Sequence, residues 1–373
     1  MIYLDNAATS FPKPRETVRA MAAALENCGA NPGRAGHALS LAAGRIVERC
    51  RESTAQMLGE TDASRVAFCL NATDALNMAI HGVVRTGDHV ISTLLEHNSV
   101  LRPLSELSRS GVITLTLVPP DAQGQICAEE IERAMLPRTR LVVMTHMSNV
   151  LGTLQDVQAV GRVCKRRGVL LLLDCAQTAG HVPLAPKAWG CDLLAMPGHK
   201  GLLGPHGTGV LWVRAGVSVA PLRQGGTGSA SESMFQPRMM PDCLESGTLN
   251  LPGIAGLAAG MNEALVHMDE THAHIVHLCD MLRAELLNMR GVRVYTRPGA
   301  SLVSFNVEGV GSQETAAMMN RAGIAVRGGL HCAPGVHRFL GTLDVGAVRV
   351  SPGIYNMRED MTALARAVAK MTG

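Results

Sequence analysis

Residues 192–213 read DLLAMPGHKGLLGPHGTGVLWV, and this stretch places one lysine, Lys200, between two apolar runs. The runs at 192–196 and 209–213 predict two short strands covered on both faces, because such strands are continuously apolar. The residues between the runs include the glycines Gly201, Gly204 and Gly207. Glycine allows a backbone to approach another group closely. We therefore expect Lys200 to lie at the mouth of a sheet, within reach of a ligand.

On both sides of this stretch, apolar runs alternate with helical patterns. The expected strands are 65–70, 89–93, 141–147 and 169–174. The expected helices are 72–84, one that begins near Asn98, and 154–168. This alternation is typical of a mostly parallel sheet with helices on both faces, so the sequence predicts an α/β fold.

The C-terminal part of the chain has a different pattern. Residues 253–289, which follow Pro252, predict one or two long helices. The remainder predicts a smaller α+β domain, with strands near 292–295, 301–307 and 346–350 and helices near 312–322 and 358–371.

The composition argues against several classes of protein. Of the 373 residues, 47% are hydrophobic and the formal net charge is only +3, so nothing predicts binding to nucleic acid or to an anionic membrane surface. The chain opens MIYLDNAATS, without the basic and apolar regions of a signal peptide. No apolar run approaches the ~20 residues that span a bilayer, and we expect a cytoplasmic protein. The ten cysteines form no CxxC pair, which argues against a zinc or dithiol site.

Four histidines at 267, 272, 274 and 277 raise the alternative of a metal site. They fall in an expected helix, where some of them could share a face. No carboxylate or cysteine arrangement completes a known ligand set with them. We interpret them as solvated or capping residues and predict no metal.

Polar residues at or just beyond the expected strand ends form the candidate site, because ligands of such sheets bind outside the carboxyl ends of the strands. All of them should converge on one rim. They are Asn71, Ala72, Thr73, His97, Ser148, Asn149, Asp174, Gln177, His199 and Lys200.

Asp174 and Lys200 together indicate a cofactor. Asp174 follows the apolar strand VLLLL, and a carboxylate there is either a helix N-cap or the partner of a buried cation. A desolvated lysine has a lowered pKa and becomes a nucleophile toward carbonyl groups. Pyridoxal 5'-phosphate needs both groups, a lysine for its aldehyde and an acid for its pyridine nitrogen. We predict this cofactor.

Other rim residues fit further parts of the same cofactor. The turn at Ala72 and Thr73 opens a helix, whose free N–H groups and dipole attract a phosphate. His97 has two interpretations, a ring that stacks on the cofactor or an ordinary polar residue. Asn149 and Gln177 can donate hydrogen bonds to a phenolate oxygen.

Cys332 differs from the other cysteines. It lies in AVRGGLHCAPGVH (325–337), a loop rich in glycine and proline, with Arg327, His331 and His337 nearby. Cations beside a thiol raise its thiolate fraction, so this loop predicts a reactive cysteine.

Arg349 is a single guanidinium inside an expected strand, AVRV. Its planar fork suits a bidentate clamp on a substrate carboxylate. An ordinary structural ion pair is the alternative.

Nine motifs follow one another along nearly the whole chain. They are YLDNAATSFPKP, NATDALN, EHNSVLRPL, SNVLGT, DCAQTAGH, GHKGLLGPHGTGVLW, ESGTLNLPGI, RGGLHCA and VRVSPGIYN. In this order they resemble the cysteine desulfurase and selenocysteine lyase group of the class V aminotransferase superfamily. The resemblance implies a fold-type I pyridoxal-phosphate enzyme, with a mostly parallel seven-stranded sheet in a large domain (15–255). A small α+β domain would comprise residues 1–14 and 256–373.

The resemblance also implies roles at the cofactor. Lys200 would bind it as a Schiff base and carry the proton of the substrate α-carbon. Asp174 would pair with the pyridinium nitrogen, and Gln177 would reach the phenolate oxygen. His97 would stack on the ring, and Asn149 would lie near the cofactor and the substrate carboxylate.

The phosphate, by the same resemblance, would be held by Thr73 and His199 together with the turn at Ala72. Thr248 would reach the phosphate bound to the neighbouring subunit, which implies a homodimer. Pro197 stands where the family often has a serine that contacts the phosphate.

The implied activity is that of a cysteine desulfurase. Arg349 would clamp the carboxylate of L-cysteine, and Cys332 would take its sulfur as a persulfide, leave L-alanine, and pass the sulfur to an acceptor such as a protein. Gly328 and Leu330 depart from the loop of the nearest relatives, which has threonine and histidine there. The alternatives are a selenocysteine lyase, another class V enzyme that acts on a different amino acid, and a non-catalytic sulfur carrier or binding protein.

Overall fold

A seven-stranded sheet forms the centre of the computed structural model, which describes residues 1–33 and 36–372. Its strands, in spatial order, are β2 (Val66–Cys69), β8 (Gly209–Val213), β7 (Leu193–Pro197), β6 (Leu170–Asp174), β5 (Thr139–Thr145), β3 (Asp88–Thr93) and β4 (Ile113–Val118). Only β8 runs antiparallel to its neighbours β2 and β7. The expected α/β fold with a mostly parallel seven-stranded sheet is confirmed.

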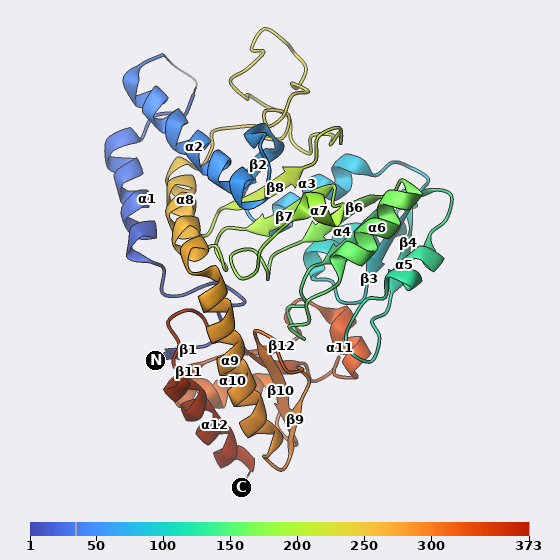
Figure 1. Cartoon of the computed structure of the whole chain (residues 1–373), viewed down its shortest axis with the longest axis vertical. Helices are drawn as coiled ribbons and strands as arrows, with labels where there is room; N and C mark the ends of the chain where they lie inside the picture. The colour runs from blue at the N-terminus through green and yellow to red at the C-terminus, as the bar shows by residue number, and fades with distance from the viewer. Residues whose placement is uncertain (34–35, 373) are drawn as a thin grey trace.

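Helices cover both faces of this sheet, as continuously apolar strands require. In β6, Leu171 and Leu173 belong to one apolar core while Leu172 belongs to another, because alternate side chains of a strand point to opposite faces. The connecting helices are α3 (Ala72–Val83), α4 (Asn98–Arg109), α5 (Ala128–Ala134), α6 (Val157–Arg167) and α7 (Pro186–Trp189), as Figure 1 shows.

Two N-terminal helices that the sequence patterns did not indicate pack beside the sheet. They are α1 (Arg15–Cys28) and α2 (Ala38–Met57), and both lie along α8 (Leu251–Val266) in Figure 1. A short 3₁₀ helix, η1 (Ala63–Arg65), leads from α2 into β2.

A buried ion pair links α2 to the segment that leads into α8. Arg51 Nη1 lies 2.7 Å from Glu245 Oε1, and both side chains are 5% exposed. The same carboxylate oxygen accepts a hydrogen bond from Phe68 N at 2.6 Å. The pair therefore also holds β2, an outer strand of the sheet.

A smaller sheet forms the lower part of the molecule in Figure 1. Its antiparallel strands, in order, are β12 (Arg327–Gly329), β13 (Ala347–Val350), β10 (Val303–Val307) and β9 (Val292–Val294). A third apolar core lies between this sheet and the helices α9 (Met268–Leu287), α10 (Ser312–Arg321) and α12 (Arg358–Thr372). The short helix α11 (Pro334–Leu340) connects β12 and β13.

Two connections join the upper and lower parts. Helix α8 runs into α9 with only His267 between them, so one long helical rod reaches from one sheet to the other (Figure 1). At the N-terminus, β1 (Ile2–Tyr3) pairs with β11 (Ile324–Ala325) beside the smaller sheet, before the chain crosses to α1. The division into domains at residues 14–15 and 255–256 stays a prediction.

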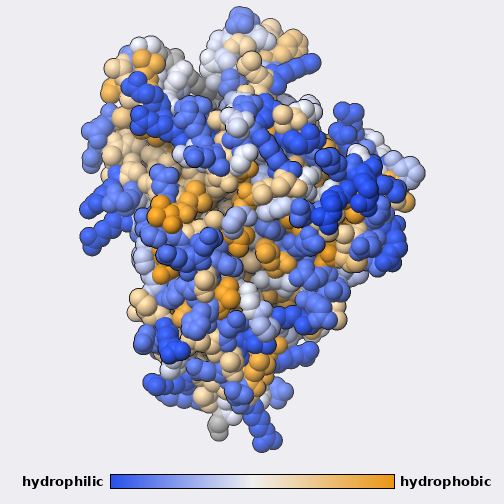
Figure 2. Space-filling view, viewed as in Figure 1, coloured by the Kyte–Doolittle hydropathy of each residue, from blue (hydrophilic) through white to orange (hydrophobic). Residues whose placement is uncertain are grey.

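In the part of the chain that the structure describes, no helix is both long enough and apolar enough to cross a bilayer. On the face drawn in Figure 2, hydrophilic residues predominate and hydrophobic residues form separate patches.

Candidate active site

A cavity of about 290 Å³ lies beyond the carboxyl ends of β5, β6 and β7. It brings together all of the predicted site residues except Ser148, Thr248 and Cys332. These are Asn71, Ala72, Thr73, His97, Asn149, Asp174, Gln177, His199, Lys200 and Arg349. The expectation that the strand ends converge on one rim is therefore correct, because parallel strands end at the same edge of a sheet.

Lys200 enters the cavity from a turn that begins directly after β7. A Cβ on Gly201 would lie 2.3 Å from Ala179 O, and one on Gly198 would lie 2.1 Å from Thr208 Oγ1, so both flanking positions require glycine. Burial and the charges of Arg349 and Arg327 lower the pKa of Lys200 to about 8, against the opposing effect of Asp174. A minor fraction of this amine, about a tenth, is therefore neutral at pH 7, far more than for an ordinary lysine.

Asp174 ends β6 and is 3% exposed. Its Oδ1 accepts a hydrogen bond from Ala176 N at 2.9 Å, so it caps the turn that follows the strand. Burial raises its pKa, while that hydrogen bond and the charge of Lys200 act in the opposite direction. Asp174 thus caps a turn and is not a helix N-cap, since the next helix begins only at Pro186, and its pairing with a cation stays a prediction.

His97 is the N-cap of α4. Its Nδ1 accepts a hydrogen bond from Ser99 N at 3.0 Å, so the neutral ring carries its proton on Nε2. Burial and the nearby charges of Lys200 and Arg327 lower its pKa to about 4. The Ser99 hydroxyl lies 2.7 Å from Thr73 Oγ1, which ties the first turns of α3 and α4 together.

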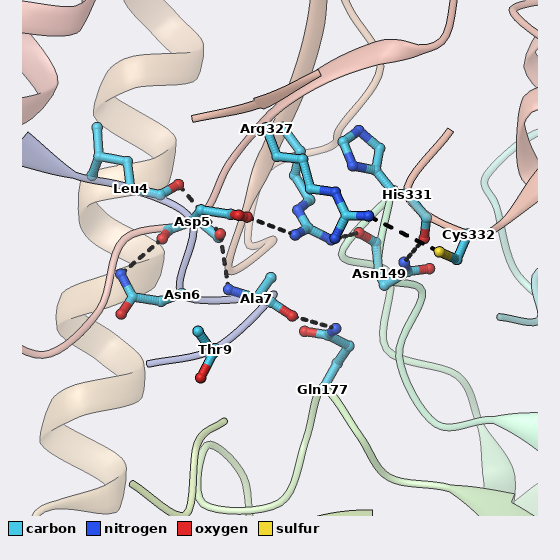
Figure 3. A network of polar contacts seen from close by, with 12 residues as sticks. Leu4, Asp5, Asn6, Ala7, Thr9, Asn149, Gln177, Arg327, His331 and Cys332 are labelled. Carbon is cyan, nitrogen blue, oxygen red and sulfur yellow. Dashed lines mark hydrogen bonds and ion pairs between the residues drawn. The ribbon is translucent and has the colours of Figure 1, made fainter. Parts of the chain in front are cut away.

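The N-terminal segment forms one wall of the cavity, which the analysis of single residues did not anticipate. Ala7 and Ala8 line the cavity. Gln177 Nε2 donates to Ala7 O at 3.1 Å (Figure 3). Arg349 Nη2 donates to Asp5 Oδ1 at 2.8 Å. The sequence did contain a signal for this wall, the motif YLDNAATSFPKP. Its polar residues were not chosen as candidates because they follow no expected strand.

Arg349 lies in β13 and is 1% exposed. Its Nη1 donates to Asn149 O at 3.1 Å, and the Asn149 side chain in turn donates to His331 O at 2.7 Å. The Nε atom is buried and has no partner among the described residues. The structural ion pair considered for this arginine exists, to Asp5, and Nε is the one guanidinium nitrogen that has no partner among the described residues.

His199 also retains an unused polar atom. Its Nδ1 is buried without a partner among residues 1–33 and 36–372. Its ring stacks on His206 at 5.1 Å between centroids, and burial with the charge of Lys200 lowers its pKa to about 3. The backbone carbonyl of His199 accepts from Lys13 Nζ at 2.7 Å, which fixes the turn before Lys200.

Cys332 lies at the edge of the site and is half-buried. Both His331 and Cys332 have left-handed backbone conformations, with φ of 49° and 56°. The Cys332 carbonyl accepts from Asn98 N at 2.7 Å, and Arg327 Nη2 lies 4.0 Å from Sγ (Figure 3).

The expectation that two histidines add positive charge beside Cys332 is wrong. Burial and the charge of Arg349 lower the pKa of His331 to about 3, and burial lowers that of His337 to about 4. Both rings are neutral at physiological pH. Arg327 is the cation that contacts the thiol.

One of the three departures from the family pattern, Gly328, has a local explanation. A Cβ on Gly328 would lie 2.3 Å from Ser312 O, so the start of α10 leaves no room for a side chain. Pro197 ends β7 and lines the cavity. Leu330 is 37% exposed.

Thr248 does not reach the cavity of its own chain. It is exposed and lines a separate small hollow with Arg223 and Asn250. This position neither supports nor contradicts its predicted contact with a neighbouring subunit.

Two of the four histidines considered for a metal site, His267 and His274, have other contacts. His267 faces Glu270 at 3.5 Å, and His274 Nε2 contacts Asn356 O at 2.8 Å. Burial lowers the pKa of His272.

The family model for aminotransferase class-V matches residues 2–364. The chain belongs to the class V aminotransferase family. The expected membership is thereby confirmed, and the match spans nearly all of the chain.

Within this family, the chain is 34% identical over 384 residues to a protein of Methanothermobacter thermautotrophicus named "Probable cysteine desulfurase", with 100% of this chain and 95% of the relative covered. A protein of the same name from Halalkalibacterium halodurans is 31% identical, with 99% and 93% covered.

Solved structures of class V relatives show the same fold. A cysteine desulfurase of Thermococcus onnurineus NA1 superimposes with a TM-score of 0.92 at 30% identity, covering 100% of this chain and 94% of that one. The cysteine desulfurase CsdA of Escherichia coli superimposes with a TM-score of 0.90 at 27% identity, covering 99% and 94%.

Proposed function

We propose that this chain is a pyridoxal-phosphate-dependent cysteine desulfurase, which converts L-cysteine to L-alanine and takes the sulfur onto Cys332 as a persulfide. The observation that carries the proposal is the convergence of Lys200, Asp174 and His97 on one cavity, with Cys332 beside Arg327 at its edge. The relatives named as cysteine desulfurases, which match the chain along its full length, support it.

The residues present fit the cofactor. The cavity offers an amine with a lowered pKa, a buried carboxylate and the first turn of α3, whose N–H groups at Ala72 and Thr73 lack intrahelical acceptors. The buried, unpartnered Nδ1 of His199 is a further polar atom that a phosphate would satisfy.

Pyridoxal phosphate, when bound, supplies an electron sink for bonds at the α-carbon of an amino acid. Lys200 would hold the aldehyde in the resting enzyme and would move a proton to and from the α-carbon, since its amine is neutral in part at the pH of the cell. Asp174 would pair with the ring nitrogen, and His97 presents a neutral ring with its proton on Nε2.

Arg349 binds the substrate carboxylate through the nitrogen that no described residue uses. Its other two nitrogens are held by Asp5 and by the Asn149 carbonyl, so the guanidinium is oriented before a substrate arrives. This preorganisation lowers the entropic cost of binding.

Sulfur transfer uses the Cys332 thiolate, whose charge Arg327 offsets. A bond forms between Sγ and the substrate sulfur, the carbon–sulfur bond breaks, and its electron pair stays with the carbon fragment. Protonation of that fragment gives alanine. The persulfide then awaits an acceptor.

The proposal includes a homodimer. Its basis is the resemblance, which gives Thr248 a role at the phosphate of a second copy; Thr248 is exposed and lines a hollow outside its own cavity, so it is free for such a contact. A cytoplasmic location is part of the same proposal.

The test is alanine release from L-cysteine and from selenocysteine, measured with the wild type and with Cys332→Ala. We expect cysteine turnover with an added thiol to fall at least about a hundredfold in the variant. Undiminished cysteine turnover would remove the persulfide role. A strong preference for selenocysteine that survives the substitution would favour a selenocysteine lyase.

A further inference from the structure

A second hollow, of about 500 Å³, lies beside the segment that carries Cys332, and we name it the α4–α11 groove. One wall is α4 along its whole length and the other is the start of α11, with the end of β4 between them. The side chains of Leu94, Leu101 and Leu117, together with Pro334, give it an apolar floor. Because β4 is an outer strand of the sheet, the groove opens on the surface.

The groove is fixed relative to the thiol. Asn98, a groove residue, donates its backbone N–H to Cys332 O at 2.7 Å. At Gly335, a Cβ would lie 2.3 Å from Leu94 O, so α11 packs directly on the backbone that precedes α4. Anything bound in the groove is therefore held at a constant distance from Cys332.

The rim of the groove carries an excess of positive charge. Arg109 pairs with Glu106 at 2.7 Å. Arg102 and Arg338 are exposed, and neither forms an ion pair with an acidic residue among those described. The groove thus has an apolar floor and two arginines without acidic partners. It should favour a ligand that is partly apolar and acidic, because positive charges attract and retain a negative one.

We propose that the α4–α11 groove docks an acidic, partly apolar segment of the protein that accepts sulfur from Cys332. This rests on the proposed function, which generates the persulfide. In the transfer, a thiolate of the acceptor attacks the outer sulfur of the persulfide. A sulfur–sulfur bond forms on the acceptor, the bond to Cys332 Sγ breaks, and Cys332 leaves as a thiolate, so no further oxidant or reductant is required.

The experiment uses the holoenzyme with L-cysteine and three thiol acceptors. Two are peptides of equal length with one cysteine and one leucine, in which the other residues are acidic in one peptide and basic in the other. The third is dithiothreitol. The enzymes are the wild type, the double variant Arg102→Glu/Arg338→Glu, and the control Arg366→Glu, which reverses an exposed charge on α12. Persulfide on each peptide is measured by mass spectrometry at subsaturating concentration.

We expect the wild type and the control to transfer sulfur to the acidic peptide on the order of tenfold faster than to the basic one. The double variant should lose or invert this preference, while its rate with dithiothreitol stays unchanged. Equal rates for both peptides with the wild type, or an undiminished preference in the double variant, would overturn the proposal.

Two further readouts separate the possible failures. Fluorescence anisotropy with acidic and basic peptides that carry serine in place of cysteine measures docking without turnover, and equal affinities would reject the groove as the docking site. If the wild type releases no alanine even with dithiothreitol, the proposed function fails and the acceptor proposal with it. A change of oligomeric state in the double variant, seen by sedimentation, would assign the groove to a contact between two copies instead.

Discussion

Asp5 and Arg349 form an ion pair, with 2.8 Å between Oδ1 and Nη2, that ties the N-terminal segment to β13 in the wall of the cavity. The guanidinium also donates to Asn149 O, and only its Nε lacks a partner among the described residues. An acidic residue close to the start of the chain thus sets the orientation of a basic residue near its end.

Asp5→Asn should weaken substrate binding more than it slows the chemistry. Without the carboxylate, the Arg349 guanidinium loses its fixed orientation, and we expect KM for L-cysteine to rise about tenfold, equivalent to ~1.4 kcal/mol, with a smaller change in kcat. The exposed Asp344→Asn serves as the control. Steady-state kinetics decide the matter, and an unchanged KM would contradict the positioning role of Asp5.

Lys200→Ala should remove the visible absorbance of the protein reconstituted with pyridoxal phosphate. The band requires a covalent bond between the Lys200 amine and the cofactor aldehyde, whereas noncovalent binding leaves the free aldehyde spectrum. Lys165→Ala, on the exposed side of α6, should keep the band. A retained band in Lys200→Ala would show that another amine binds the aldehyde.

The rate of cofactor uptake by the apoprotein should depend on pH through Lys200. The neutral amine reacts, and burial lowers its pKa to about 8, so the rate should rise with pH up to about 8 and then level. Asp174 raises the pKa of Lys200, and Asp174→Asn should therefore move this midpoint to lower pH. Stopped-flow absorbance measures the rate, and a midpoint that moves upward in the variant would disagree with the assignment.

Arg327→Met should slow the alkylation of Cys332. The guanidinium lies 4.0 Å from Sγ and both neighbouring histidines are neutral, so the variant leaves the thiolate without the cation beside it. We expect iodoacetamide to modify Cys332 about threefold more slowly, measured by peptide mapping. Exposed Cys127 provides the internal reference, and an equal slowing there would attribute the effect to something other than Arg327.

Glu245→Gln should destabilise the fold. It leaves the buried Arg51 guanidinium without its counter-charge and weakens the bond from Phe68 N, at a cost of about 3 kcal/mol in the free energy of unfolding. Urea denaturation followed by circular dichroism measures it. Glu106→Gln removes an exposed pair and should cost less than about 1 kcal/mol. Equal losses in the two variants would refute the special contribution of the buried pair.

The parallel strands and the residues at their ends could be predicted from the sequence, because both have a local signal. Strands covered on both faces are continuously apolar, as in β6 and β7, and topology alone brings Asp174 and Lys200 to one edge. Strand β4 was missed because it is an outer strand with threonines at 114 and 116, which breaks the apolar run. Helix α1 buries only Thr17 and Ala24, so its apolar stripe is narrow.

The contacts that complete the site could not be predicted residue by residue. Asp5 and Arg349 form their contact although they lie near opposite ends of the sequence. Ser99 links α3 and α4 through its hydroxyl, and no spacing pattern in the sequence indicates this contact. The charge of His331 was misjudged because charge depends on burial, which the sequence of a short glycine-rich loop does not reveal.

The segment that carries Cys332 is clamped at both ends. Upstream, Gly328 lies under the start of α10, and downstream Gly335 lies against Leu94, in each case with no space for a methyl group. A chain spans at most ~3.5 Å per residue, and this segment is short and fixed at both ends. It therefore cannot carry Cys332 over a long distance. The sulfur that the proposed reaction places on Cys332 would therefore stay at this position, and the acceptor would have to approach it there.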